Sequence, residues 1–286
     1  MNLEDLLLRP LERLELDQAI EWAAEEGWNP GLHDADIFWE TDPAGFVGAE
    51  YEGNLVATGS IVSYDDNFGF MGFFIVRPDL RGKGIGTKLW FFRRDQLRSR
   101  LNPGAAIGMD GVFDMQDWYA RGGFQFTHRN LRMHGTGQAA SRHPLVVPLR
   151  SVPLDQVYSF DQSHFGCARD SFIKSWITMP DSTALGFVDD NRLCGFGTIR
   201  QCREGHKIGP LFAETPEAAE QLFTSLSSQA DGKPIWMDIP ENNSDAVALA
   251  TRHGMTEVFG CARMYHGEIP DLPWNQIYGI TTFELG

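Results

Sequence analysis

Residues 76–89 constrain the fold of this chain more than any other segment. They join an apolar strand, residues 73–76, to an amphipathic segment through a turn that contains Gly82, Gly84 and Gly86. Glycines lack the Cβ atom that would keep a phosphate away from the backbone, and the first turn of the following helix offers unpaired N–H groups and the positive end of its dipole. The sequence therefore predicts a strand, an anion-binding loop and a helix in succession, and a diphosphate fits that loop.

The charge distribution supports an anionic ligand at this loop. The 286-residue chain has a formal net charge of −15, yet residues 77–100 are predominantly basic. The basic side chains of this region are Arg77, Arg81, Lys83, Lys88, Arg93, Arg94, Arg98 and Arg100. A local positive field favours a phosphate ligand, whereas the acidic total disfavours nucleic acid as a partner. A solvated basic helix face is the alternative interpretation.

The spacing of this motif resembles a known family. Arg81, Gly84 and Gly86 follow the pattern Arg/Gln-x-x-Gly-x-Gly/Ala, five residues after the strand, and this resembles motif A of the GNAT superfamily of acyl-CoA-dependent N-acyltransferases. A dinucleotide fingerprint does not fit, because Thr87 stands where it needs glycine. The resemblance implies acetyl-CoA as cosubstrate. The residues that it implies for coenzyme binding are Phe74, Ile75, Val76, Arg81, Gly82, Lys83, Gly84, Ile85, Gly86 and Thr87.

The apolar periodicity predicts an α/β fold built on a mixed, twisted sheet. The predicted strands of the first half are residues 6–9, 45–51, 55–64, 69–76 and 105–109, and the predicted helices are residues 17–26, 84–99 and 114–121. In GNAT folds the strands equivalent to residues 69–76 and 105–110 separate, and the pantetheine arm of the coenzyme enters between them. The resemblance implies the same arrangement here.

Tyr119 is the predicted general acid. It stands five residues before Phe124, as the family's tyrosine stands before its Gly-Phe pair, and the resemblance implies that its hydroxyl protonates the departing thiolate. A buried structural tyrosine is the alternative. The family's frequent asparagine, seven residues before the tyrosine, is replaced by Val112.

The predicted chemistry is direct transfer from the thioester to a neutral amine, with the backbone N–H of Val76 stabilising the oxyanion. Many relatives use a glutamate six residues before this valine, but Phe70 occupies that position here. Asp110 is the predicted base, and Asp34 and Asp36 are alternatives. Capping or surface roles are equally compatible with each of these carboxylates.

The segment between the first predicted helix and the hairpin, residues 26–36, is where GNAT enzymes line the acceptor site. Its aromatic and acidic residues are suited to an ammonium group. The predicted substrate-binding residues are Trp28, Asn29, Asp34 and Asp36. His33 is interpreted as a surface residue.

Repeated patterns predict two copies of one fold. Leu55, Gly59 and Ile61 recur as Leu193, Gly197 and Ile199, and Gly123 with Arg132-Met133 recurs as Gly254 with Arg263-Met264. We predict an N-terminal GNAT acetyltransferase domain, residues 1–136, and a C-terminal GNAT-like domain, residues 145–286. In the second copy, residues 209–220 carry three glutamates in place of the glycine loop, which would repel a pyrophosphate. Asn243 keeps the family's asparagine position, while Ala250 occupies the tyrosine position.

Composition narrows the class of protein. The four cysteines have no metal-ligand spacing, so no metal is predicted, and the acidic N-terminus with no long apolar run predicts a cytoplasmic protein without membrane contact. We predict an acetyl-CoA-dependent N-acetyltransferase that acts on a primary amine of a small molecule. The alternatives are a non-catalytic acyl-CoA sensor, which the retained Tyr119 disfavours, and a protein-lysine acetyltransferase targeted by its C-terminal domain. The identity of the amine and the oligomeric state, including a homodimer, stay open.

Overall fold

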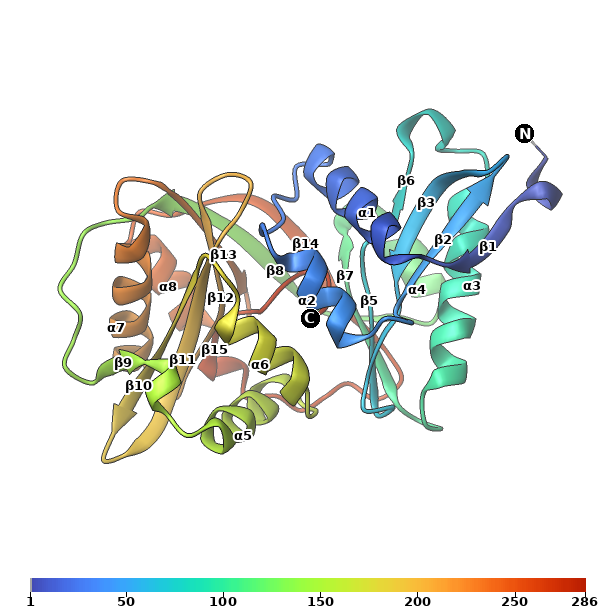
Figure 1. Ribbon diagram of the computed structural model, residues 1–286. Coiled ribbons are helices and arrows are strands. Elements are labelled where there is room, and N and C mark those ends of the chain that lie inside the picture. The colour runs from blue at the N-terminus through green and yellow to red at the C-terminus, as the bar shows by residue number, and fades with distance from the viewer. Residues whose placement is uncertain (1) are drawn as a thin grey trace.

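The computed structural model describes residues 2–286 and has two α/β modules side by side (Figure 1). The elements of the first half are β1 (Leu7–Pro10), α1 (Arg13–Glu25), α2 (Asp34–Thr41), β2 (Phe46–Tyr51), β3 (Asn54–Ser60), β4 (Val62–Tyr64), β5 (Phe68–Met71), β6 (Ile75–Val76), α3 (Ile85–Arg100), β7 (Ala106–Val112), α4 (Gln116–Arg121) and β8 (Gln125–Thr136). Those of the second half are β9 (Val146–Pro148), α5 (Leu154–Phe165), α6 (Asp170–Thr178), β10 (Ser182–Asp189), β11 (Arg192–Gln201), β12 (His206–Ala213), α7 (Pro216–Ser227), β13 (Pro234–Pro240), α8 (Ser244–Arg252), β14 (Thr256–His266) and β15 (Ile277–Gly279). The mixed α/β architecture predicted from the sequence is confirmed.

The strands form two sheets. A small antiparallel sheet has the order β1-β2-β3-β6, and an 11-stranded sheet has the order β4-β5-β7-β14-β8-β13-β12-β11-β10-β9, with β15 beside β12. Two neighbouring pairs in the large sheet are parallel, β5 with β7 and β12 with β13. Each half therefore contributes one parallel pair, at corresponding places in its own module.

The two halves exchange their long strands β8 and β14. β7 pairs with β14 of the second half, with Met109 opposite Met264, and β8 pairs with β13, with Met133 opposite Met237. In Figure 1 the green strand β8 and the red strand β14 run side by side between the modules, and they also pair with each other. One continuous sheet therefore connects both modules through backbone hydrogen bonds.

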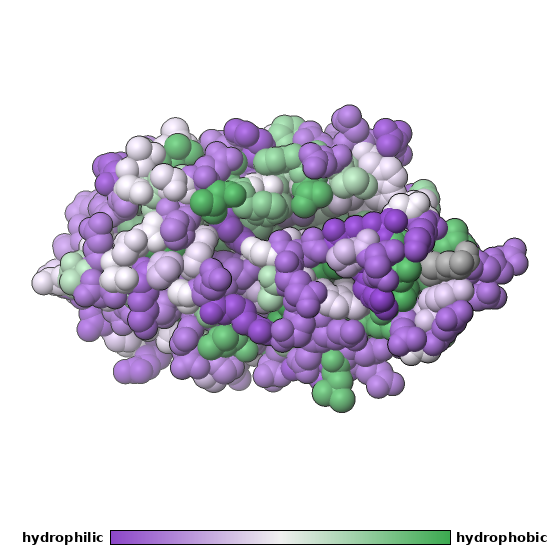
Figure 2. Space-filling view, turned by 90° about the horizontal axis from the view of Figure 1, so that it is seen from above, coloured by the Kyte–Doolittle hydropathy of each residue, from purple (hydrophilic) through white to green (hydrophobic). Residues whose placement is uncertain are grey.

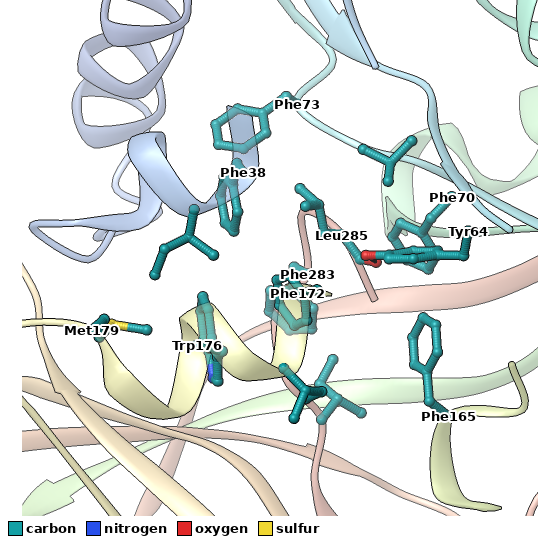
Figure 3. Close-up of a cluster of buried hydrophobic side chains, with 14 of the residues drawn as sticks. Phe38, Tyr64, Phe70, Phe73, Phe165, Phe172, Trp176, Met179, Phe283 and Leu285 are labelled. Atoms are coloured by element: carbon teal, nitrogen blue, oxygen red, sulfur yellow. Dashed lines mark hydrogen bonds between the residues drawn. The ribbon is translucent and has the colours of Figure 1, made fainter. Parts of the chain in front are cut away.

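Three clusters of buried apolar side chains form the core. One lies in each module, and a third lies between them and takes residues from both halves. Figure 3 shows part of this third cluster, in which Phe38 and Phe73 of the first half face Trp176 of α6, and Phe283 and Leu285 lie among them. The rings of Phe38 and Trp176 stack with centroids 6.3 Å apart. The segment that follows β15 is thus buried between the modules.

The single strand predicted over residues 69–76 is wrong. The chain leaves β5 after Met71 and resumes as β6, which pairs with β3 of the small sheet, and Phe73 between them has a φ of 49°. At Gly72 an added Cβ would lie 2.1 Å from the carbonyl oxygen of Glu284. The break follows from close packing against the C-terminal segment, which the local sequence pattern does not contain.

The face in Figure 2 is largely hydrophilic, and its hydrophobic residues form small groups. Within residues 2–286 no helix is both long and apolar enough to span a bilayer. The same residues contain no group of three or more His, Cys, Asp or Glu side chains that could hold a metal ion.

Candidate active site

A cavity lies where the central strands of the first module separate. β5 and β7 pair in parallel as far as Met71 opposite Met109, after which β6 turns to β3 and the rest of β7 pairs with β14. The cavity has a volume of about 70 Å³. Its polar and catalytically relevant lining comes from both halves: Arg93, Asp110 and Tyr119 from the first, and Cys261 and Glu284 from the second.

The glycine loop adopts the backbone of an anion cradle. Gly82 and Gly84 have φ values of 75° and 87°, in the left-handed region that favours glycine. Gly84 is the N-cap of α3 and has no side chain with which to cap it, so the first-turn N–H groups keep their hydrogen-bonding capacity. A Cβ added at Gly82 would meet nothing within 4 Å. This open loop before a 16-residue helix fits a pyrophosphate.

The side chains of Arg81 and Lys83 stabilise the glycine loop through contacts within the protein. Arg81 donates from Nε to the carbonyl oxygen of Val76 at 2.9 Å and forms an ion pair with Glu26. Lys83 donates from Nζ to the carbonyl oxygen of Asp79 at 3.1 Å. The side chains of Arg81 and Lys83 would therefore have to break these contacts before they could bind a ligand.

The backbone of β6, which follows the strand break at Gly72 and Phe73, pairs with β3 on one side and leaves its other side unpaired within residues 2–286. Arg77 donates its N–H to the carbonyl oxygen of Val56 on β3. Because hydrogen-bonding direction alternates along a strand, the N–H group of Val76 points away from β3. Phe74 lines the cavity, whereas Val76 does not.

Tyr119 is buried against β7. Its side chain is 4% exposed, and its ring packs on Trp90 with centroids 5.0 Å apart. An added Cβ at Gly111 would lie 2.4 Å from the Tyr119 ring, so glycine at this position on β7 makes room for it. Burial raises the pKa of Tyr119 to about 12, and the Arg93 guanidinium opposes the rise. The hydroxyl is therefore protonated at neutral pH and available as a donor.

Arg93 is a buried cation without a carboxylate partner. It is 1% exposed, and Nη2 donates to the carbonyl oxygens of Ser60 and Gly72 at 2.8 and 2.6 Å. Nε and Nη1 have no hydrogen-bond partner within residues 2–286. Burial lowers the pKa of Arg93 to about 9. A guanidinium held in this way favours negative charge that develops in the cavity.

Sequence reasoning assigned Arg93 only to the basic region. The sequence also contains a signal that Arg93 is buried. Residues of α3 that stand four positions apart form a row along one face of the helix, and every residue of this row except Arg93 is apolar. That row is Ile85, Leu89, Arg93 and Leu97, all of them buried. A charged residue in an apolar row predicts a buried cation.

Asp110 joins the exchanged strands. Its two carboxylate oxygens accept from Nε and Nη2 of Arg263 on β14 at 2.8 and 2.7 Å, and Oδ1 also accepts from Asn130 on β8 at 2.8 Å. Burial raises the pKa of Asp110, while the Arg263 guanidinium opposes the rise. A carboxylate with these three donors serves first to hold β7, β14 and β8 together.

The predicted acceptor residues lie along the boundary with the second module. Asp34 is buried and pairs with Arg200 through contacts of 2.9 and 3.1 Å. Asn29 exchanges two hydrogen bonds of 2.9 Å with the backbone of Glu204. Both side chains are engaged in holding the modules together.

Asp36 and Trp28 have different surroundings. Asp36 is exposed and forms an ion pair with Arg13. Trp28 lines the cavity, and its carbonyl oxygen accepts from Arg132 at 2.8 Å and from Lys207 at 3.3 Å. Of the four predicted substrate-binding residues, the structure brings only Trp28 to the cavity.

Glu284 is the cavity residue that sequence reasoning missed. Its side chain is 5% exposed, and Oε2 is buried with no hydrogen-bond partner within residues 2–286. The main chain of Glu284 lies against Gly72 at the strand break, and its carbonyl oxygen is 3.4 Å from Oγ of Ser60. No motif surrounds this residue in the sequence, so only the fold brings it to the cavity.

The corresponding place in the second module is filled by the chain itself. β12 and β13 pair in parallel only from His206 to Ile208, and farther on β15 pairs with β12. Asn243 donates from Nδ2 to the carbonyl oxygen of Ile277 in β15 at 2.9 Å. The side chain at the family's asparagine position thus holds the chain's own backbone.

The helix that corresponds to α3 also differs. α7 follows β12 after two residues, Glu214 and Thr215, and the Thr215 hydroxyl accepts from the backbone N–H of Ala218 at 3.2 Å. A side chain therefore occupies one of the first-turn donors that would hold a phosphate.

Comparison with known protein families also finds one match in each half of the chain. The model of the acetyltransferase (GNAT) family matches residues 12–124, and the model of an acetyltransferase (GNAT) domain matches residues 157–279. A curated relative, holothin acyltransferase from Pseudoalteromonas sp. (strain SANK 73390), is 29% identical over 270 residues, which cover 93% of this chain and 90% of the relative.

Solved structures share the fold over nearly the whole chain. A candidate acetyltransferase from Pyrococcus horikoshii superimposes with a TM-score of 0.84 at 23% identity, covering 100% of this chain and 98% of that one. A tandem GNAT protein from the clavulanic acid biosynthesis pathway superimposes with a TM-score of 0.63 at 12% identity, covering 93% and 99%. At these identities the similarity establishes the fold alone.

Proposed function

We propose that the first module of this chain transfers the acetyl group of acetyl-CoA to the primary amine of a small molecule. The chain belongs to the acetyltransferase (GNAT) family and carries two GNAT domains. The observation that carries the proposal is the cavity where β5 and β7 separate, because Phe74, Arg93 and Tyr119 line it together. The acyl transfer that the name of the Pseudoalteromonas relative describes supports the same class of reaction. An acyl-CoA substrate also suits the cytoplasmic location that we propose.

The loop and the strand break supply the binding groups. Backbone N–H groups of residues 82–87 would hold the pyrophosphate at the N-terminus of α3. The outward-facing backbone groups of residues 74–76 would pair with the pantetheine amides as an added strand. Bound in this way, acetyl-CoA supplies an activated acyl group at the cavity.

Three groups of the first module would act on the reacting atoms. The N–H of Phe74, which lines the cavity, replaces that of Val76 as our choice for the oxyanion donor. The Arg93 guanidinium adds positive charge close to the Phe74 ring, with Cζ 4.9 Å from its centroid. Tyr119 gives its proton to the departing sulfur and regains one from the nitrogen of the new amide, so the protons balance.

The cavity volume favours a small acyl group. A space of about 70 Å³ leaves room for an acetyl group. Acetyl transfer is therefore the form of the reaction that we propose.

Isothermal titration calorimetry with acetyl-CoA, followed by a thiol-release assay with primary amines, tests the proposal. We expect one site per chain, because β15 and Thr215 occupy the corresponding space in the second module. A stoichiometry of two would contradict the assignment of the site to one module, and binding without turnover of any acceptor would favour a sensor.

A further inference from the structure

We propose that Glu284 binds the ammonium group of the acceptor and takes its proton, so that the second half of the chain completes the active site of the first. This inference rests on the proposed function and identifies a residue of that same site. Neither the glycine loop nor Tyr119 supplies a proton acceptor, and the reaction needs one because an amine attacks only in its neutral form.

The backbone around Glu284 is fixed from both modules. After β15, Ile280 donates its N–H to the carbonyl oxygen of Asp238 at 2.9 Å in the second module. Tyr64 of the first module donates its hydroxyl to the carbonyl oxygen of Leu285 at 2.9 Å. Phe283 and Leu285 lie in the apolar cluster of Figure 3, on either side of Glu284 in the sequence. The backbone at Glu284 is therefore held in one place relative to the cavity.

Two carboxylate side chains line the cavity among the residues that the structure describes, those of Asp110 and Glu284, and only Glu284 has no hydrogen bond to its carboxylate. Oε2 is buried without a hydrogen-bond partner, whereas Asp110, which also lines the cavity, accepts from Arg263 and Asn130. A buried acceptor without a partner is destabilising, so such a group is uncommon unless a ligand or water satisfies it. An ammonium group satisfies it with an N–H donor and a positive charge.

The neighbouring charges keep this carboxylate available. The charged and titratable groups that interact electrostatically with Glu284 are Arg132 on β8, Arg200 on β11, Lys207 on β12 and Cys261 on β14. Arg132 is paired with Asp238, and Arg200 with Asp34. Lys207 has no carboxylate in contact, and its Nζ donates to the carbonyl oxygen of Trp28. Lys207 thus interacts electrostatically with Glu284, and within residues 2–286 no cation forms a salt bridge with the Glu284 carboxylate.

The chemical step balances. The ammonium nitrogen transfers one proton to the Glu284 carboxylate and becomes a neutral amine, which attacks the thioester carbonyl. The carbon–sulfur bond breaks as the carbon–nitrogen bond forms, Tyr119 protonates the sulfur, and the nitrogen of the new amide returns a proton to Tyr119. Glu284 then releases its proton to solvent. Because Trp28, Phe259 and Phe283 line the same cavity as Glu284, the proposed acceptor is a small primary amine with an apolar body. An amine that carries its own carboxylate would be repelled.

Glu284→Gln tests the assignment, because it preserves shape and removes the charge. The matched control is Glu268→Gln, which removes an exposed carboxylate from the loop that follows β14. The probes are acetyl-CoA and a panel of benzylamine, 2-phenylethylamine, n-butylamine and 4-aminobutyrate. Calorimetry gives acetyl-CoA affinity, thiol release gives kcat and KM from pH 5 to 9, and thermal melting reports folding.

We expect Glu284→Gln to bind acetyl-CoA within about twofold of the wild type. Its kcat/KM for the apolar amines should fall by about 10²-fold, and the acid limb of the pH profile should disappear. Glu284→Asp, which keeps the carboxylate and withdraws it by one methylene, should recover part of the rate. The control should match the wild type in every measurement.

Other outcomes overturn the inference. An unchanged pH profile and kcat/KM in Glu284→Gln would exclude the role of base. A loss of rate that follows the loss of folded protein, equal in the Gln and Asp variants, would leave Glu284 a structural residue. Acetylation of none of the amines by a wild type that binds acetyl-CoA would exclude an amine site at Glu284. Failure to bind acetyl-CoA would instead reject the proposed function, so the two failures are distinguishable.

Discussion

The two modules separate their parallel strands at corresponding places and use the space differently. In the first, the separation of β5 from β7 leaves a cavity lined by Tyr119 and Arg93. In the second, the separation of β12 from β13 is filled by β15, which Asn243 holds by a hydrogen bond to Ile277. The difference teaches that an opening between parallel strands of this fold can be closed by the chain's own backbone without loss of the surrounding sheet.

The helix N-termini show the same contrast. Gly84 leaves the N–H groups at the start of α3 without a side-chain cap, whereas the Thr215 hydroxyl caps α7. The segment that closes the second opening continues to the first and places Glu284 in its cavity. The segment after β15 therefore belongs to the second half of the chain and lines the cavity of the first module.

The largest effect should come from the substitution Gly84→Asp. It adds a Cβ and a negative charge at the N-cap of α3, where we place the pyrophosphate, so acetyl-CoA binding should be abolished. The matched control is Thr215→Asp, because Asp is also a good N-cap residue and α7 should tolerate it. Calorimetry of both folded variants checks the pair. If Gly84→Asp still binds acetyl-CoA, or if Thr215→Asp does not, the proposal that only the N-terminus of α3 binds the pyrophosphate is wrong.

Tyr119→Phe should give the next largest effect. The ring that packs on Trp90 remains and only the hydroxyl is removed, so acetyl-CoA affinity should change little while kcat falls by about 10²–10⁴-fold. Tyr278→Phe is the control in the second module, because its hydroxyl is buried without a hydrogen-bond partner within residues 2–286. Steady-state kinetics measure both variants. Equal kcat in Tyr119→Phe and the wild type would mean that another group or water protonates the thiolate.

Asn243→Ala should lower the free energy of unfolding and leave the rate of acetyl transfer unchanged. The amide donates to the carbonyl oxygen of Ile277, and Oδ1 caps α8 by accepting from the N–H groups of Asp245 and Ala246. Loss of the cap and of a buried hydrogen bond should cost about 2–4 kcal/mol of unfolding free energy in denaturant titration. Asn243→Asp keeps the cap and removes only the donor, so it should cost less. If both variants match the wild type, Asn243 does not hold β15 in place.

The sequence predicted the local features of the first module because their causes are local. The glycine loop, α3 and α4 follow from glycine positions and helical periodicity, and the presence of two modules followed from repeated spacing. The pairing of β7 with β14 could not be predicted, because β8 and β14 have similar lengths and nothing in either sequence specifies its partner. For the same reason the position of Glu284 was missed, since it depends on a segment that packs against residues far away in the chain.

The smallest effect concerns acid stability at the exchanged strands. His128 on β8 is buried against Trp274 of the second half, with ring centroids 4.2 Å apart, and burial lowers the pKa of His128 to about 3. The unfolded chain takes up a proton at this residue near pH 6.5 and the folded chain does not. The stabilising contribution of neutral His128 is therefore fully present above pH 6.5 and is lost as the pH falls from there toward about 3.

Wild-type unfolding free energy should accordingly fall with decreasing pH in this window, by up to about 1.4 kcal/mol per pH unit from this one proton. His128→Phe removes the titrating group and keeps the packing volume, so its slope should be smaller by up to one proton. His134→Phe, at a half-buried position on the same strand, is the control. Denaturant titrations at several pH values between 3 and 7 measure the three slopes. Identical slopes in His128→Phe and the wild type would mean that acid acts on the exchanged strands through their ion pairs, such as Arg132 with Asp238, and not through the buried imidazole.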